Sequence, residues 1–188
     1  MARMLVPLLC GMCLAGLPRL AAADSFAAYG WTVSSSPDDP FHTEGDLPTS
    51  TLSLWLQCSA GSGIAAAQFE LVAPPGTTVV SFAPRSGFLN GGTARQLQLA
   101  VGGCPYGPVL AGIWTLSGAT PGSYCLAATH PSGMILTVDC DSADPGLHDG
   151  AQVGYGAGAP PACDERGLLC HTTAVSPRTW GGVKASYR

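Results

Sequence analysis

Two clusters of acidic side chains are the residues of this sequence whose types and spacing best suit chemistry. The first contains Asp38, Asp39, Glu44 and Asp46, and the second contains Asp139, Asp141, Asp144 and Asp149 together with His148. Calcium takes six to eight oxygen ligands from carboxylates and carbonyls. Asp139, Asp141 and Asp144 are therefore a candidate calcium site, although neither cluster has the D-x-[DN]-x-[DN]-G spacing of a calcium loop. A solvated acidic surface is the alternative, and we expect no other cofactor.

The histidines are the other candidates for acid–base chemistry. The sequence has His42, His130, His148 and His171, all in turn-like stretches. It has no G-x-S-x-G, H-E-x-x-H or P-loop motif. We therefore expect solvated loop histidines and no catalytic residues. The alternative is a small hydrolase whose site combines loop acids and histidines, with His130, His148 and Asp144 as its candidates.

Tryptophan rings offer a route to binding without catalysis. Trp55 lies on the opposite side of its predicted strand from Leu52, Leu54 and Leu56, so its ring could stack on a sugar or a partner protein. Trp114 lies in an apolar run. Core packing is the alternative for both rings.

A leader segment fixes the expected compartment. Arg3 precedes an apolar run from Met4 to Leu17, and Ala21-Ala-Ala23 fits a signal peptidase site, so residues 1–23 are a predicted signal peptide. The run is shorter than the roughly 20 residues that a membrane helix needs. We expect export to the extracellular space, periplasm or cell surface, without stable membrane insertion after cleavage.

The 165 residues that remain are acidic. Six Lys and Arg stand against twelve Asp and Glu, a formal charge of −6. This balance argues against nucleic acid as a partner, because such binding depends on clustered basic residues. A protein or a glycan is the expected partner.

The exported part contains six of the eight cysteines, at positions Cys58, Cys104, Cys125, Cys140, Cys163 and Cys170. An even number in an exported chain predicts disulfides. A zinc site is the alternative, but no C-x-x-C occurs among these six.

Six cysteines allow 15 pairings, among which spacing alone does not choose, but local arguments favour two of the pairs. If Ser132-Gly133 forms a two-residue hairpin turn, Cys125 lies opposite Cys140. Cys163 and Cys170 flank a short polar loop, which makes a local bond between them plausible. Cys58 and Cys104 then remain as the third pair. The predicted bonds are Cys125–Cys140, Cys163–Cys170 and Cys58–Cys104.

Period-two alternation of apolar residues recurs along the chain and predicts strands. The predicted strands lie near 26–33, 51–58, 67–71, 77–82, 97–101, 109–116, 124–128 and 134–140. Turn residues separate them, such as Asn90-Gly-Gly92 and Pro121-Gly122. This pattern predicts an all-β fold, an antiparallel β-sandwich of the immunoglobulin or cohesin type, stapled by disulfides. The predicted core contains Leu54, Leu56, Phe69, Leu71, Val80, Leu97, Leu99, Ile113 and Leu136.

The composition changes after the last clear strand. We expect the sandwich to occupy residues 24–142, followed by a Gly-, Ala- and Pro-rich extension over 143–188. Within it, Gln152–Tyr155 could add an edge strand. Trp180, Val183 and Tyr187 fall on one face of a short predicted helix, and Trp180 and Tyr187 are candidate contacts to a partner.

Several short motifs carry a resemblance to known proteins. They include Tyr29-Gly-Trp-Thr, Leu54-Trp-Leu-Gln-Cys58, Cys104-Pro-Tyr-Gly-Pro108 and the ending Trp180-Gly-Gly-Val-Lys-Ala-Ser-Tyr-Arg188. The chain resembles a group of secreted bacterial β-sandwich proteins without an established activity, and its strands also resemble cohesin-type and immunoglobulin-like modules. The resemblance implies compartment and fold, not chemistry.

Together these features predict a secreted, non-catalytic module that binds or scaffolds at the cell exterior. A structural subunit of a surface assembly, docked through the C-terminal tail, is the alternative, followed by the small hydrolase.

Overall fold

The structure is a computed structural model that describes residues 26–27, 29–45, 50–59, 63–141, 146–156 and 167–168. Several predictions fall on residues outside these ranges. They are the signal peptide, the Cys163–Cys170 bond, the candidate ligand Asp144 and the tail residues Trp180 and Tyr187.

Two packed β-sheets make up the fold, and no helix occurs in the ranges given above. The five-stranded sheet has the order β12 (Ala151–Val153), β2 (Gly30–Ser34), β3 (Thr51–Cys58), β8 (Val109–Ser117) and β5 (Thr78–Pro84). The six-stranded sheet has the order β11 (Leu147–Asp149), β10 (Leu136–Asp139), β4 (Ile64–Val72), β7 (Gln96–Val101) and β6 (Phe88–Asn90), and β9 (Cys125–Ala127) also pairs with β4. A separate parallel pair joins β1 (Phe26–Ala27) to β13 (Gly167–Leu168).

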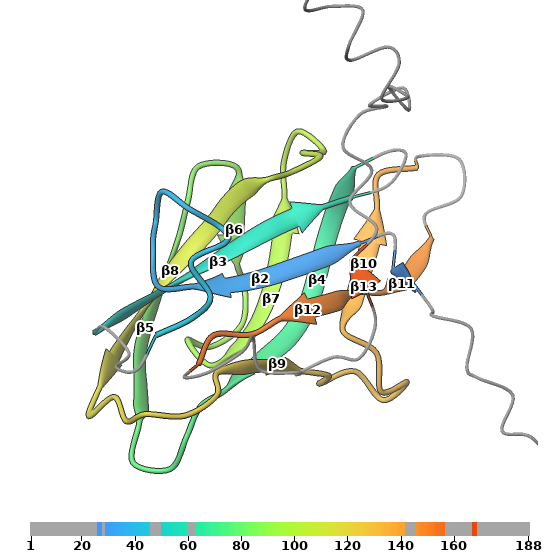
Figure 1. The fold of residues 1–188 in the computed structure, drawn as a ribbon. Helices are drawn as coiled ribbons and strands as arrows, with labels where there is room; N and C mark the ends of the chain where they lie inside the picture. Colours follow the sequence, from blue (N-terminus) through green and yellow to red (C-terminus); the bar gives the residue numbers. More distant parts are fainter. Residues whose placement is uncertain are drawn as a thin grey trace, which may run out of the picture.

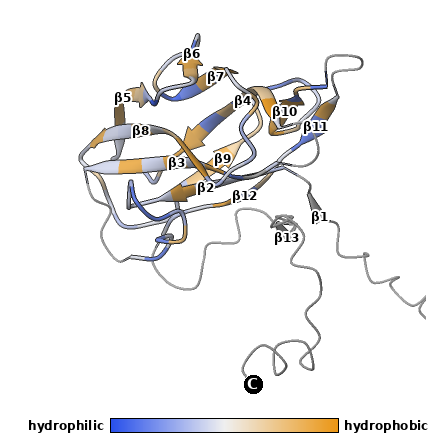
Figure 2. Cartoon of the chain, turned by 90° about the horizontal axis from the view of Figure 1, so that it is seen from above, coloured by the Kyte–Doolittle hydropathy of each residue, from blue (hydrophilic) through white to orange (hydrophobic). Residues whose placement is uncertain are grey.

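Most neighbouring strands are antiparallel, and β12 with β2 is a parallel exception. Seen from above, the two sheets form two layers (Figure 2). This arrangement confirms the predicted all-β sandwich. Both β11 and β12 come from the predicted extension and join the sheets, so the sheets continue past residue 142, where we expected the sandwich to end.

The core lies between the sheets and follows the predicted alternation. On the six-stranded sheet, Ala67, Phe69 and Leu71 of β4 are buried, while the residues between them are only half-buried. Leu97 and Leu99 of β7 are also buried. These inward positions confirm the sequence pattern, because successive side chains of a strand point to opposite faces.

Three predicted core residues lie differently. Ile113 and Leu136 are half-buried, and Val80 is 56% exposed. The prediction for Val80 is wrong because of a β-bulge, where the register with β8 shifts between Val79 and Ser81. A bulge adds one residue to the strand. Val79 and Phe82 therefore pack against the core, and Val80 points outward.

The predicted hairpin that contains Cys125 and Cys140 is also wrong. Strands β9 and β10 do not pair with each other; both pair with β4, with Ala127 opposite Glu70 and Leu136 opposite Gln68. They run in the same direction along one edge of β4. A turn does form near Ser132-Gly133, where the Gly133 N–H donates to His130 O at 2.9 Å, but this turn belongs to a loop between the two strands.

This arrangement separates the cysteines that the hairpin would have joined. Cys125 lies opposite Val72, whereas Asp139, next to Cys140, lies opposite Ile64. Val72 and Ile64 are eight positions apart on β4, a distance of about 26 Å along a strand. This separation is too large for a disulfide between Cys125 and Cys140.

The bond that forms is Cys104–Cys140, with Cα atoms 5.9 Å apart. The predicted bonds Cys125–Cys140 and Cys58–Cys104 are therefore wrong. Cys125 is disulfide-bonded as well, to a cysteine other than Cys140. The Cys104–Cys140 bond links the connection between β7 and β8, just after β7, to the end of β10.

Buried hydrogen bonds also cross between the sheets. The Trp31 indole N–H of β2 donates to Thr137 Oγ1 of β10 at 3.2 Å. The Gln152 side-chain amide of β12 pairs with both backbone groups of Leu126 in β9. Within the described ranges, every buried side-chain nitrogen and oxygen has a hydrogen-bond partner. These contacts fix how the sheets sit on each other.

Candidate functional site: the open face of the six-stranded sheet

One face of the six-stranded sheet has no covering layer in the described part of the chain. Outward side chains of four neighbouring strands form its central part, and we call this central surface the open face. It contains Leu89 of β6, Gln98 and Ala100 of β7, Ala66 and Gln68 of β4, and Leu136 and Val138 of β10.

Strand register places these residues in rows across the sheet. Leu89 lies opposite Ala100, Ala100 opposite Ala66, and Ala66 opposite Val138. We call these four residues the apolar row. Leu89 is 72% exposed, and the two alanines lower the surface beside it. The rows form because partners on neighbouring strands point to the same face.

A polar row runs beside the apolar row. Gln98 lies opposite Gln68, and Gln68 lies opposite Leu136. The Gln68 amide donates to Thr129 Oγ1 at 3.3 Å. Farther along the same strands, Arg95 lies 3.6 Å from the carboxylate of Glu70. The open face therefore offers apolar contact flanked by amide groups and little net charge.

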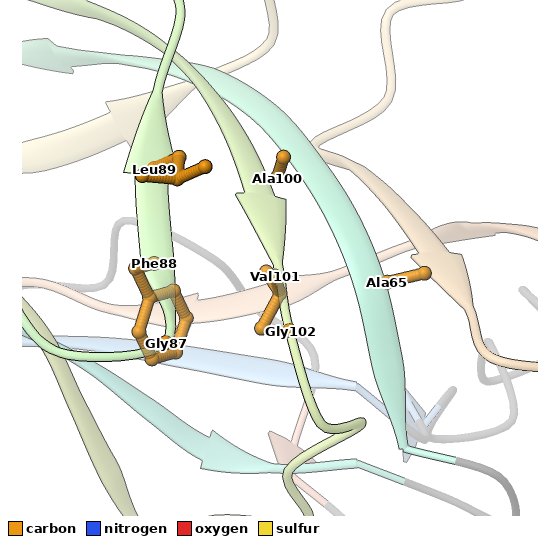
Figure 3. A pocket seen from close by; sticks show the side chains of 7 residues that line it. All are labelled: Ala65, Gly87, Phe88, Leu89, Ala100, Val101 and Gly102. Carbon is orange, nitrogen blue, oxygen red and sulfur yellow. The ribbon is translucent and has the colours of Figure 1, made fainter.

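Two shallow grooves follow the apolar row. One has a volume of about 450 Å³ and is lined by Ala65, Gly87, Phe88, Leu89, Ala100, Val101 and Gly102. Its lining side chains come from β6, β7, β4 and the glycines that follow β7 and precede β6 (Figure 3). The second, of about 280 Å³, lies between β7, β4 and β10. Both contain Ala100, so the two grooves meet at this residue.

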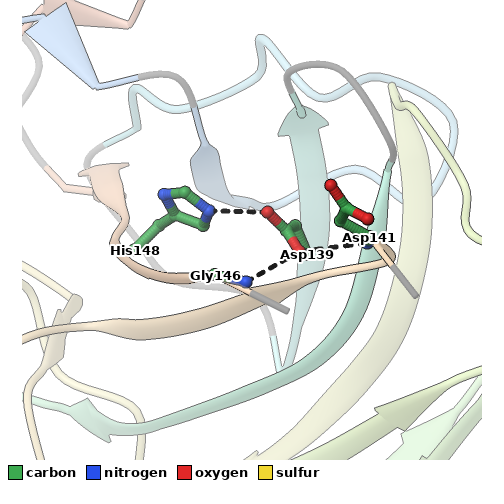
Figure 4. Close-up of polar contacts among 4 residues, drawn as sticks. All are labelled: Asp139, Asp141, Gly146 and His148. Carbon is green, nitrogen blue, oxygen red and sulfur yellow. Dashed lines mark hydrogen bonds and ion pairs between the residues drawn. The ribbon is translucent and has the colours of Figure 1, made fainter. Parts of the chain in front are cut away.

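A polar cluster occupies the junction between β10 and β11, at Asp139 and His148 (Figure 4). The His148 Nε2 donates to Asp139 Oδ2 at 2.9 Å, and the backbone N–H groups of Asp141 and Gly146 each donate to Asp139 Oδ1 at 3.0 Å. The His148 ring stacks on Tyr29 with centroids 4.4 Å apart. This arrangement holds the end of β10 against the start of β11.

Electrostatics in this cluster favour the ionised carboxylate. The hydrogen bond from His148, followed by those from the Gly146 and Asp141 N–H groups, holds the pKa of Asp139 below its usual value. Burial, with a further contribution from the Asp139 charge, raises the pKa of Tyr29. Asp139 thus acts as an anion that accepts three donors.

Calcium ligation at the predicted residues is only partly visible. Asp139 directs both carboxylate oxygens toward N–H donors, Asp141 lies two residues on, and Asp144 lies outside the described ranges. In those ranges, no three His, Cys, Asp or Glu side chains are grouped closely enough to hold a metal ion. The calcium site stays a prediction.

The candidate hydrolase residues are held in separate local contacts. The Nδ1 of His130 lies 2.7 Å from Ser132 Oγ within an exposed turn, whereas His148 contacts Asp139 and Tyr29. A Ser–His pair two residues apart is a turn contact, and a nucleophile also needs an oriented base and an oxyanion site.

The tryptophan rings of the described residues are buried, so they are not exposed for stacking on a ligand. Trp55 is 9% exposed, and its indole N–H donates to Ser36 O at 3.2 Å, because the segment after β2 covers it. Trp31 and Trp114 are fully buried. In the part of the chain that the structure describes, the exposed aromatic side chains are Phe41 and Tyr106, which lie in loops.

Sequence reasoning missed the open face, although its signal was present. The outward positions of the strands near 64–72 and 96–101 hold Ala and Gln more often than charged residues, which is unusual for a solvated sheet face. Comparisons with models of known protein families, with curated proteins and with solved structures found no match for this chain. No helix in the described ranges is long and apolar enough to cross a membrane.

Proposed function

We propose that this chain is a secreted, non-catalytic binding module that holds a partner protein on the open face. The observation that supports this proposal is the apolar row: Leu89, Ala100, Ala66 and Val138 lie side by side on four strands without a covering layer in the described ranges. Exposed apolar patches with a polar border are typical of protein-binding surfaces.

The composition of the open face favours a protein over a glycan. Aliphatic and small side chains make the apolar row, and Gln68 and Gln98 offer amide donors and acceptors beside it. Sugar-binding surfaces stack rings on aromatic side chains, and the exposed Phe41 and Tyr106 lie on loops instead. Few charges need to be stripped of water when a protein covers such a surface.

Export is the second part of the proposal. The signal peptide predicted at residues 1–23 supports it, and the Cys104–Cys140 disulfide is compatible with an oxidising compartment. The partner would then be a protein of the cell exterior.

The test is a binding measurement with matched variants. Purified chain would be applied to arrays of exported proteins from the producing cell and, in parallel, to glycan arrays. Ala100→Glu places a charge on the apolar row, and Thr115→Glu places the same charge on an exposed position of β8 in the other sheet.

We expect wild type and Thr115→Glu to bind one protein partner and Ala100→Glu to lose at least about tenfold in affinity. Equal binding by both variants would place the binding surface elsewhere. Glycan binding that Ala100→Glu leaves intact, or turnover of a substrate without stable binding, would contradict the proposal.

A further inference from the structure

Strand β5 ends the five-stranded sheet and leaves one edge open. Within the described ranges it pairs only with β8. It has seven residues, whereas the other outer strands of the two main sheets, β6, β9, β11 and β12, have three each. Among the described residues, the open edge of β5 is therefore the longest row of unpaired backbone groups that these sheets present.

The side chains on this edge do little to prevent pairing. No charged residue occurs between Leu71 and Pro84, and the strand itself, Thr-Val-Val-Ser-Phe-Ala-Pro, is rich in β-formers. Edge strands of soluble proteins normally carry charges, prolines or bulges that block added strands. Here Pro84 and Arg85 mark only the end of the strand, and the bulge exposes Val80 instead of hiding it.

We propose that two copies of this chain pair edge to edge through β5, antiparallel, so that their five-stranded sheets become one continuous sheet. A strand that pairs with its own copy in this way needs only a two-fold axis, and each backbone contact then forms twice. Val80 lies beside the axis and loses much of its exposure. The pair is closed, because each copy uses its one long open edge.

Charge favours a second copy as the occupant of this edge. The chain is acidic, with a formal charge of −4 for the full sequence, so most approaches of two copies bring like charges together. The β5 edge is a strip without charge, and contact there avoids that repulsion. The opposite side of the sandwich is different, because Gln152 already joins β12 to β9 there.

This inference is independent of the proposed partner surface, because the open face belongs to the six-stranded sheet. The test compares Val80→Lys with Leu147→Lys in the full disulfide-bonded chain. Leu147 is a matched control: it is 59% exposed, close to the 56% of Val80, and lies on β11 at a different sheet edge. A lysine on an edge strand blocks pairing because its charge would have to lose water.

Light scattering after size exclusion, over a concentration series, gives the mass of each variant. We expect wild type and Leu147→Lys to reach twice the chain mass, and Val80→Lys to raise the dimer dissociation constant at least about tenfold. Hydrogen exchange gives a second measure: the amide of Phe82 should become more protected as the wild-type concentration rises.

Each other outcome contradicts the inference. If the wild type stays monomeric across the series and Phe82 exchange does not depend on concentration, β5 does not pair with its own copy. A dimer unchanged in Val80→Lys, or lost equally in Leu147→Lys, would place the contact elsewhere. Mass that grows past two copies would show open association instead of a closed pair.

Discussion

The two sheets of this sandwich differ in how many faces they bury. In the five-stranded sheet, every residue of β2 is buried, and so are residues 52–57 of β3, whose side chains point alternately to the two faces. In the six-stranded sheet, β4 alternates between buried and half-buried residues and keeps one face open. The difference comes from the segment after β2, which folds over the outer side of β3.

This contrast assigns different roles to the two sheets: the five-stranded sheet stabilises the fold, and the six-stranded sheet offers a surface for a partner. The five-stranded sheet, in which β2 and β3 are covered on both faces, holds Trp31, Trp55 and Trp114, the largest side chains of the packed interior. The sheet with one open face displays small and amide side chains that a partner can approach. Changes to the covered side chains of β2 and β3 should therefore cost folding stability, and changes on the open face should cost binding.

The strongest test of this contrast replaces one side chain on each outer surface. Trp55→Ala should lower the free energy of unfolding by about 3–5 kcal/mol, because its ring is covered and leaves a cavity. Gln98→Ala, exposed on the open face, should change it by less than about 0.5 kcal/mol. Urea unfolding measures both. Equal, small losses would show that the outer side of β3 is not covered.

A second test removes the disulfide between the β7–β8 connection and the end of β10. Cys104→Ala with Cys140→Ala opens a loop whose ends are 36 residues apart, and we expect a loss of about 2–4 kcal/mol. Thermal unfolding of the oxidised double variant measures it. An unchanged midpoint would mean that noncovalent contacts alone hold the β7–β8 connection against the end of β10.

A third test concerns the buried hydrogen bond between the sheets. Thr137→Val keeps the side-chain shape but leaves the Trp31 N–H, which Thr137 Oγ1 now accepts, without its partner. Losing it should cost about 1–3 kcal/mol. Thr115→Val, on the exposed side of β8, is the control and should be nearly neutral. The same chemical unfolding measurement, made on both variants, gives the difference.

The smallest effect should come from Asp139 and should depend on pH. Its pKa is lower in the folded state than in the unfolded chain, so its stabilising effect is complete above the usual Asp pKa of about 3.9. The effect is lost as pH falls through the lower folded pKa. Asp139→Asn should therefore melt below wild type at neutral pH, and the gap should close under acid conditions. A gap that is constant with pH would contradict this.

Local patterns in the sequence predicted the layered architecture, because strand alternation depends only on neighbouring residues. Leu54, Phe69 and Leu97 are buried where the alternation places them. Val80 breaks the pattern through a bulge, and no local signal marks the extra residue.

Long-range pairing was beyond the sequence pattern. Cys125 and Cys140 flank an apparent hairpin, yet β9 and β10 each pair with β4 and not with each other. Which strand a segment pairs with depends on the burial of side chains across the whole sheet, and the turn between two segments does not predict that burial. The open face was hidden for a similar reason, since its rows exist only once four strands are in register.

The placement of β9 and β10 end to end on β4 has a consequence for engineering. The chain between them, which includes Ser132 and Gly133, leaves the sheet and returns to the same edge, and both residues are exposed. A longer connection there would not move either strand, since both are anchored independently. We expect this loop to accept a grafted peptide, which would make the sandwich a display scaffold with its sheets intact.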